Sequence, residues 1–425
     1  MVDETPTTGT HTHDRHASWM ELFFDLVAVA GIGQLTHLLH HGPSFGDLAL
    51  YMVLYLAFWT AWACITMYGD IAGQHAHPMM MLASMLGLGV MAAAVAGVPD
   101  RHSTTFAAVY VVVRVVLGQV WGHGRIVVDW PTAQLTVGVT PWIVSLWVPE
   151  PWKYWLWAAG LAIDLWLMFA VTGDRILARA QEELDRRLSR SHRFDDIEPP
   201  KLKAMHADPE HLGERLGLYI IIVLGEGVIT VINAVGAEAW TFHLLSLGLG
   251  AFLILAGLWA NTLLFGTIPR LMSGNDPADR VPWQHVMATH CWVTGVIAMI
   301  AAGLGMTIEH ADGQLSAGIG WTLCGGTAAY FAIIALSSLR GQHDWRTLFA
   351  VQLPCILIAV VLGVFAPHTP APALVYGIVA LITWALLWQT WTNGKWRKGS
   401  GPDRPHRTPR RNRARTTGPV EPDPI

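Results

Sequence analysis

The amino-acid sequence predicts an all-α membrane protein, a polytopic bundle of about twelve transmembrane helices. Three observations predict this fold class. Hydrophobic residues make up 52% of the 425 residues and charged residues only 14%, against about 25% charged in an average soluble protein. The apolar residues gather in runs of the roughly 20 residues that a spanning helix needs. Many of the 21 Trp residues lie at the ends of these runs, where the membrane interface favours them.

The apolar runs give the order of the elements. The candidate helices begin near Trp19, Leu48, Met79, Thr104, Thr132, Trp152, His211, Phe242, Gln284, Trp321, Arg346 and Ala373. The fifth of them covers about residues 132 to 148. Gly, Pro, Asp and His gather in the gaps, as in HHGPSFGD and APHTPAPA, which is the chemistry of turns. Most connections are therefore expected to be short.

One long polar interruption divides the chain into two halves of about six helices each. The expected organisation is a polar N-terminal tail (1–17), a first transmembrane half (18–171), a cytoplasmic linker (172–210), a second transmembrane half (211–392) and a basic tail (393–425). The linker begins with DRILARAQEELDRRLSR, in which apolar residues recur at spacing four from Ile176 to Leu188. This spacing predicts an amphipathic helix, solvated or lying on the membrane surface.

The basic residues predict the orientation. Of the 27 Lys and Arg residues, 23 fall on the side of the two termini in a twelve-helix arrangement, and only Arg101 and Lys153 fall on the opposite side. Cytoplasmic loops carry the excess of basic residues, so both termini are expected in the cytoplasm. The tail is rich in Arg, Pro and Gly and is expected to be disordered and attracted to anionic lipids. No specific nucleic-acid site is indicated.

Several function classes lack their motifs. The sequence contains no Walker A motif, no GxGxxG after a strand, no GxSxG and no HExxH, so we expect no catalytic residues, no cofactor and no enzyme activity. The four Cys residues lie inside apolar runs without CxxC spacing. The closely spaced His residues at 11–16, 75–77 and 40–41 lack the fixed frame of a closed metal site. We expect solvated histidines there and no metal.

The first helix of each half opens in the same way. WMELFFDLVAVAGIGQLTHLLHH and HLGERLGLYIIIVLGEGVITVINAV each begin with a charged turn. An apolar run follows, and then a Gly-centred break at Gly31 and Gly33 in one helix and at Gly225 and Gly227 in the other. The two segments point the same way across the membrane. This pattern suggests the hypothesis of two parallel repeats of about six helices.

Both helices carry ionisable residues into the membrane. Asp25 and Arg215 lie one to two turns inside the cytoplasmic end, because each residue advances a helix by about 1.5 Å. A charge at the bilayer centre costs about 2.5 to 3.5 kcal/mol on insertion scales, so such groups face the bundle and pair. Arg215 with Asp25 or Glu21 is the expected pair. Two interpretations stay open for it, a structural clasp between the helices or part of a transport pathway.

Helical spacing assigns further candidates to faces. His211, Arg215 and Glu226 share a stripe on the seventh helix, with Glu214 further around it. Glu21 and Asp25 share a face of the first helix, whereas Gln34 and His37 lie on the other side unless the glycine region bends. The transport or ion-pathway candidates are Glu226, Asp25, Arg215, Glu21, Glu214, His211, Gln34, His37, His290 and Arg114.

Glu226 differs from the other candidates. It lies several turns inside the helix, has no basic partner on its own helix and stands in a Gly-flanked turn. These features favour a protonatable or cation-binding carboxylate. Buried polar residues elsewhere, such as Arg114 in the fourth helix and Asp164 in the sixth, are candidates to join it. For lone groups such as Asn261 and His290, an interhelical hydrogen bond is the expected role.

Three segments of the chain resemble a known family. ELFFDLVAVAGIGQLTHLL and HLGERLGLYIIIVLGEGVI are similar to two signatures of the bacterial low temperature requirement protein A family, and HVMATHCWVTGVIAMIAAGLGMTIEH resembles its later helix with His290 and Glu309. The resemblance covers about residues 18 to 392 and departs mildly at Ala28 and Ala30. It implies a multi-pass protein of the bacterial inner membrane, whose biochemical activity the family does not establish.

The buried ionisable groups and Gly-interrupted helices favour a secondary transporter or ion-conducting protein, with an unknown small solute or ion as its partner besides the lipid bilayer. The alternative is a non-transporting membrane sensor, scaffold or membrane-embedded enzyme. Deletion of residues 395–425 discriminates the two, because a transporter should tolerate the loss of the basic tail and a sensor that docks through the tail should not. Substrate, coupling ion and direction do not follow from these residues.

Overall fold

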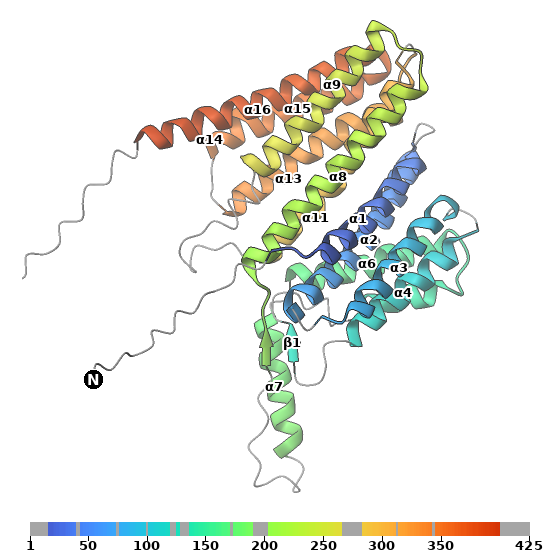
Figure 1. Cartoon of the computed structure of the whole chain (residues 1–425), viewed down its shortest axis with the longest axis vertical. Coiled ribbons are helices and arrows are strands. Elements are labelled where there is room, and N and C mark those ends of the chain that lie inside the picture. Colours follow the sequence, from blue (N-terminus) through green and yellow to red (C-terminus); the bar gives the residue numbers. More distant parts are fainter. Residues whose placement is uncertain are drawn as a thin grey trace, which may run out of the picture.

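The computed structural model shows an all-α bundle, as the composition and the apolar runs predict (Figure 1). It describes residues 16–39, 43–73, 76–98, 101–119, 125–127, 136–170, 173–189, 203–265, 283–311, 313–341 and 345–399. A two-stranded parallel sheet is the exception to the helical architecture, pairing β1 (Arg125–Val127) with β2 (Lys203–Met205). Residues 1–15 of the N-terminal tail and residues 400–425 lie outside the described residues.

The first half of the chain forms a group of helices on one side of the molecule (Figure 1). Its helices are α1 (Trp19–Thr36), α2 (Phe45–Ala72), α3 (Pro78–Ala94), α4 (Ser103–Gln119), α5 (Val139–Ser145) and α6 (Trp152–Ala170), and a 3-10 turn (His37–Leu39) extends α1. The amphipathic helix expected in the linker corresponds to α7 (Gly173–Ser189), which projects from the bundle beside the short sheet (Figure 1).

The second half contributes longer helices. These are α8 (Pro209–Ala237), α9 (Phe242–Trp259), α11 (Trp283–Glu309), α12 (Ala317–Gly320), α13 (Gly326–Gly341), α14 (Trp345–Thr347), α15 (Leu353–Phe365) and α16 (Ala371–Gly399). Single π-helical turns continue α9 through Leu264, join α12 to α13 and join α14 to α15. Each joined group is therefore one continuous span, as the sequence predicts for the helices beginning near Trp321 and Arg346.

Among the described residues, nine helices are long and apolar enough to cross a membrane. The chain is thus a multi-pass membrane protein, while the count of about twelve and the two-repeat architecture stay predictions. The apolar helix α4 is slightly shorter than these nine. Within the predicted fifth helix, the described part holds only the seven-residue α5, about 10 Å of helix. Pro149 and Pro151 follow it closely, and proline does not continue a helix.

Side-chain caps explain where several helices begin. The hydroxyl of Ser44 accepts the backbone N–H of Asp47, and the Asp47 carboxylate accepts from Ser44 in return, so α2 begins with a capping box. Asp208 caps α8 by accepting the backbone N–H groups of Glu210 and His211. Pro209 takes the first helical position, where its missing N–H costs nothing. The Asp208 cap fixes the start of the helix that carries Arg215 and Glu226.

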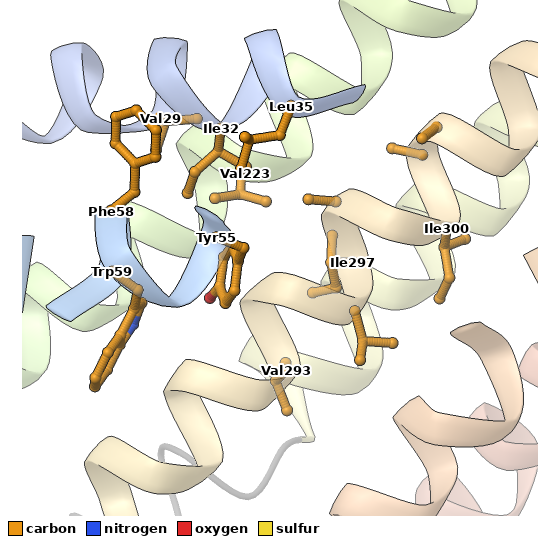
Figure 2. Packing of buried hydrophobic residues seen from close by; sticks show 14 of the residues in the cluster. Val29, Ile32, Leu35, Tyr55, Phe58, Trp59, Val223, Val293, Ile297 and Ile300 are labelled. Carbon is orange, nitrogen blue, oxygen red and sulfur yellow. The ribbon is translucent and has the colours of Figure 1, made fainter. Parts of the chain in front are cut away.

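The helix α11 lies at the centre of the bundle and has 89% of its most apolar stretch buried. It packs along α8, and α1 packs against α2, α3 and α8. Figure 2 shows the contact region of these helices, where Val29 and Ile32 of α1 meet Val223 of α8 and Ile297 of α11. We call this the apolar layer. It includes the aromatic rings of Tyr55 and Phe58 from α2.

The apolar layer depends on a close approach between α1 and α2. A methyl group at Gly31 would lie 2.5 Å from Cε1 of Phe58, closer than carbon atoms pack in proteins. The ring of Phe58 therefore occupies the space that any larger residue at position 31 would fill.

Gly31→Ala is expected to destabilise the protein by about 1 to 3 kcal/mol, because the added methyl overpacks a fully buried ring. The measurement is the midpoint of thermal unfolding of the purified protein in detergent. Gly89→Ala is the matched control, since nothing lies within 4 Å of the added carbon in α3. Equal unfolding midpoints for the two variants would show that the packing of Phe58 does not require a glycine at position 31.

Candidate functional site

Five ionisable side chains from α1, α2 and α8 meet at one end of the bundle. They are Glu21, Asp25, Asp70, His211 and Arg215, and we call them the ionic cluster. None of these residues is more than 4% exposed. Burying charges is costly unless they pair and form hydrogen bonds, so the contacts within the cluster decide whether it can exist.

Arg215 binds both carboxylates of α1. Its Nη2 donates to Oδ1 of Asp25 at 2.5 Å, and its Nη1 lies 3.7 Å from Oε1 of Glu21. Nη2 also lies 3.4 Å from the backbone carbonyl oxygen of Glu21. The pairing of Arg215 with Asp25 or Glu21 is therefore confirmed, and Arg215 contacts both residues.

His211 connects the other members of the cluster. Its Nδ1 lies 2.5 Å from Oδ1 of Asp70, and its Nε2 lies 3.4 Å from Oε2 of Glu21. The second oxygen of Asp70 accepts the backbone N–H of Asp208 at 2.6 Å. An imidazole between two carboxylates is a group that can take up and release a proton. The cluster thereby joins the ends of three helices through a titratable side chain.

Aromatic side chains close the cluster toward the membrane interior. The indole Nε1 of Trp62 donates to Oδ1 of Asp25 at 2.7 Å. The centre of its ring lies 4.0 Å from that of Tyr219 and 5.4 Å from that of His290. The hydroxyl of Tyr219 is buried, and it makes no hydrogen bond to a residue that the structure describes. The charged groups are thus sealed on this side by rings.

His290 has the structural role expected for it. The indole of Trp59 donates to Nδ1 of His290 at 3.2 Å, and Nε2 of His290 lies 3.2 Å from the carbonyl oxygen of Leu216. Since the indole can only donate, Nδ1 accepts and Nε2 carries the proton. Both ring nitrogens are engaged, so His290 holds α2, α8 and α11 together.

Glu226 lies apart from the ionic cluster, on the far side of the apolar layer. The side chain is half-buried, and its carboxylate rests against Gly33 of α1. Among the described residues, its carboxylate forms no hydrogen bond or ion pair, and only its backbone oxygen accepts from the hydroxyl of Thr230. Glu226 is therefore an acidic group inside a spanning helix without the compensation that Asp25 receives.

The other predicted candidates lie outside both features. Gln34 is exposed, on the α1 face opposite Glu21 and Asp25, as the helical spacing predicts for an unbent helix. Glu214 is exposed and accepts the backbone N–H of Ala17 at 3.3 Å. His37 follows α1 in the short 3-10 turn, and its side chain lies outside the described residues.

Arg114 forms a separate pair within the first half. Its Nη2 donates to Oδ2 of Asp164 at 3.0 Å, and Nη1 lies 2.6 Å from the sulfur of Cys64. These contacts join α2, α4 and α6. In the second half, Asn261 accepts a hydrogen bond from Gln389 at 3.0 Å, the interhelical contact expected of it.

Among the described side chains, no group of three or more His, Cys, Asp or Glu is arranged to hold a metal ion. The His residues at 11–15, 40–41 and 75 lie outside the described residues. The absence of a metal and of a cofactor therefore stays a prediction.

A comparison with protein families decides the relationship of the chain. The family described as bacterial low temperature requirement A protein (LtrA) matches residues 16–396. The chain belongs to this family. The match includes α1, α8 and α11, so the ionic cluster and Glu226 both lie within the LtrA region. No solved structure matches the chain.

A curated relative carries no assigned activity. An uncharacterized protein of Rhizobium meliloti (strain 1021) is 26% identical over 236 residues, which cover 52% of this chain and 52% of that protein. The chain thus matches about half the length of this relative. Neither the LtrA family description nor this relative states a biochemical function. The function is therefore inferred from the site.

Asp70 and Gly33 were not among the predicted site residues. Asp70 stands near the end of α2 in the sequence MYGDIAG, where an acidic residue is typical of a helix end near water. Topology offers a signal, because α2 ends on the side where α1 and α8 begin. An acidic residue at the end of α2 can therefore reach a basic residue at the start of α8.

Arg215→Ala is expected to destabilise the protein by about 3 to 5 kcal/mol, because it leaves buried carboxylates without their counter-charge. The measurement is thermal unfolding in detergent together with the yield of membrane-inserted protein. Arg186→Ala is the matched control, since Arg186 pairs with Glu182 on the exposed surface of α7, where an ion pair contributes about 0 to 1 kcal/mol. The double variant Asp25→Leu with Arg215→Leu should recover part of the loss. A double variant less stable than Arg215→Ala would contradict the pairing.

Proposed function

We propose that the protein is a secondary transporter or ion-conducting protein of the bacterial inner membrane that moves a proton or small cation through carboxylates of α1, α2 and α8. The observation that carries this proposal is Glu226. A half-buried carboxylate inside a spanning helix, with no basic partner among the described residues, has a cost that folding does not repay. Such residues typically mark ion pathways and proton relays.

The relation of Glu226 to the ionic cluster supports transport. Arg215 of the cluster and Glu226 both lie on α8, separated by about three helical turns or about 16 Å. Between them lies the apolar layer, with Val223 from α8 and Tyr55 and Phe58 from α2 (Figure 2). Two ionisable sites on either side of a dry barrier suit a protein that exposes its site to one side of the membrane at a time.

The ionic cluster contributes chemistry that fits the same role. His211 contacts carboxylates from two other helices, so a change in its protonation alters the attraction among α1, α2 and α8. If the Lys and Arg distribution sets the orientation, the cluster lies toward the cytoplasm. A proton gained or lost there would change the contacts between the two halves of the chain.

A second candidate function rests on the ion pairs within the same cluster. Arg215 has several partners and Trp62 closes the site from within, as a permanent clasp would require. On this alternative the protein is a membrane sensor or scaffold, and the buried charges serve stability only. Measurements of flux separate the two functions.

Glu226→Gln is expected to abolish proton or cation flux and leave membrane insertion intact, because the amide keeps the shape of the side chain and loses the titratable charge. Flux is measured in liposomes with a trapped pH-sensitive dye under an imposed pH gradient, and then with sodium and potassium gradients. Glu238→Gln is the matched control, since Glu238 is exposed at the end of the same helix. Unchanged flux in Glu226→Gln would contradict the proposal that Glu226 carries the proton or cation.

Asp70→Asn tests whether the ionic cluster takes part. The amide oxygen still accepts the backbone N–H of Asp208, so the start of α8 is preserved while the charge beside His211 is lost. We expect flux to fall by about tenfold and its pH dependence to shift, since a neighbouring charge perturbs the titration of an imidazole. A clasp without a transport role predicts altered stability with wild-type flux and pH dependence.

A further inference from the structure

Gly33 of α1 provides the space in which the Glu226 carboxylate lies. A methyl group at position 33 would lie 2.3 Å from Oε1 of Glu226 and 2.7 Å from its carboxyl carbon. Both distances are far below van der Waals contact. The acid of α8 therefore occupies the volume that a side chain of α1 would otherwise fill.

The neighbouring glycines have different surroundings. Gly225 precedes Glu226 on α8, and nothing lies within 4 Å of a methyl group built there. Gly227 follows it and packs against Ala301 and Leu255, at 3.0 and 3.2 Å from the same construction. Gly225 thus borders open space, and Gly227 serves the packing of α8 against α9 and α11. Of these three glycines, Gly33 makes the room for the acid.

The surface beneath the carboxylate offers it little compensation. The carbonyl oxygen of Gly33 accepts the hydroxyl of Thr36 at 2.7 Å, and the backbone N–H groups inside a helix are used within the helix. The carboxylate is therefore positioned by steric fit against α1 and not by hydrogen bonds from Gly33. Its protonation should respond to how deeply it sits, because burial disfavours the charged form of a carboxyl group.

We propose that Gly33 is the positioning residue of Glu226: its missing side chain holds the carboxylate at the seam between α1 and α8 and thereby sets the pH range in which this group exchanges a proton. The proposal rests on the function proposed for Glu226. It assigns a role to a residue of the first half that lies beside the acid of the second half, so proton exchange at Glu226 depends on how α1 and α8 fit together.

The test uses N,N′-dicyclohexylcarbodiimide, an apolar reagent that adds to a protonated carboxyl group. The carboxyl proton moves to a nitrogen of the reagent, the carboxyl oxygen bonds to its central carbon, and migration of the acyl group to nitrogen leaves a stable N-acylurea without a leaving group. The purified full-length chain is labelled across a pH series, and the modification of the Glu226 peptide is measured by mass spectrometry. This readout does not require transport.

In Gly33→Ala the pH of half-maximal labelling is expected to move by about 0.5 unit or more, since the methyl displaces the carboxylate from its seat. Gly225→Ala should keep the wild-type value, because its methyl meets open space. Gly33→Ala should also keep its unfolding midpoint within a few degrees, because only the flexible end of one side chain has to move. Glu226→Gln gives the labelling background.

An unchanged labelling profile in Gly33→Ala would overturn the proposal. Equal shifts in Gly33→Ala and Gly225→Ala would overturn it too, since the effect would then not depend on the space at Gly33. A shift confined to Gly33→Ala, with normal transport in Glu226→Gln, would support the positioning role and refute the proposed transport function. The two ideas can therefore fail separately.

Discussion

The guanidinium of Arg215 is fully buried and pairs with two carboxylates from another helix. Charges of this kind are costly to bring out of water, and a buried pair stabilises a fold only when its geometry is good. Here the geometry binds the seventh residue of α8 to the seventh residue of α1. Because these helices begin the two halves of the chain, the contact determines how the halves meet, and with it the position of everything further along α8.

The apolar layer and the site of Glu226 follow from this contact. With α1 and α8 aligned at Asp25 and Arg215, the helices run side by side far enough for Gly33 to meet Glu226. Between these two levels the helices present apolar residues to α2 and α11 (Figure 2). A shift of one turn would move Glu226 by about 5 Å, away from the glycine that leaves room for it. The ionic cluster therefore fixes the alignment of α1 and α8 that places Glu226 beside Gly33.

Composition and periodicity predict the fold class well, because membrane solvation constrains every spanning segment in the same way. The bond between Arg215 and Asp25 is predictable for a related reason, since a buried charge requires a partner at similar depth. Asp70 escapes such reasoning, because an acid near a helix end has water as an alternative partner. The role of Gly33 escapes it as well, since a glycine within an apolar run does not reveal which neighbour fills its space.

The described polar contacts between helices include both charged and neutral pairs. Within the first half Arg114 pairs with Asp164, and between the halves the acids of α1 and α2 contact His211 and Arg215 of α8. Within the second half, the hydrogen bonds between helices include Gln389 on Asn261 and Thr262 on Tyr330. Neutral hydrogen bonds between membrane helices contribute about 0.6 kcal/mol on average and do not change with pH. The contact of His211 with Glu21 and Asp70 is titratable, so a pH-dependent rearrangement is expected where α8 meets the first half.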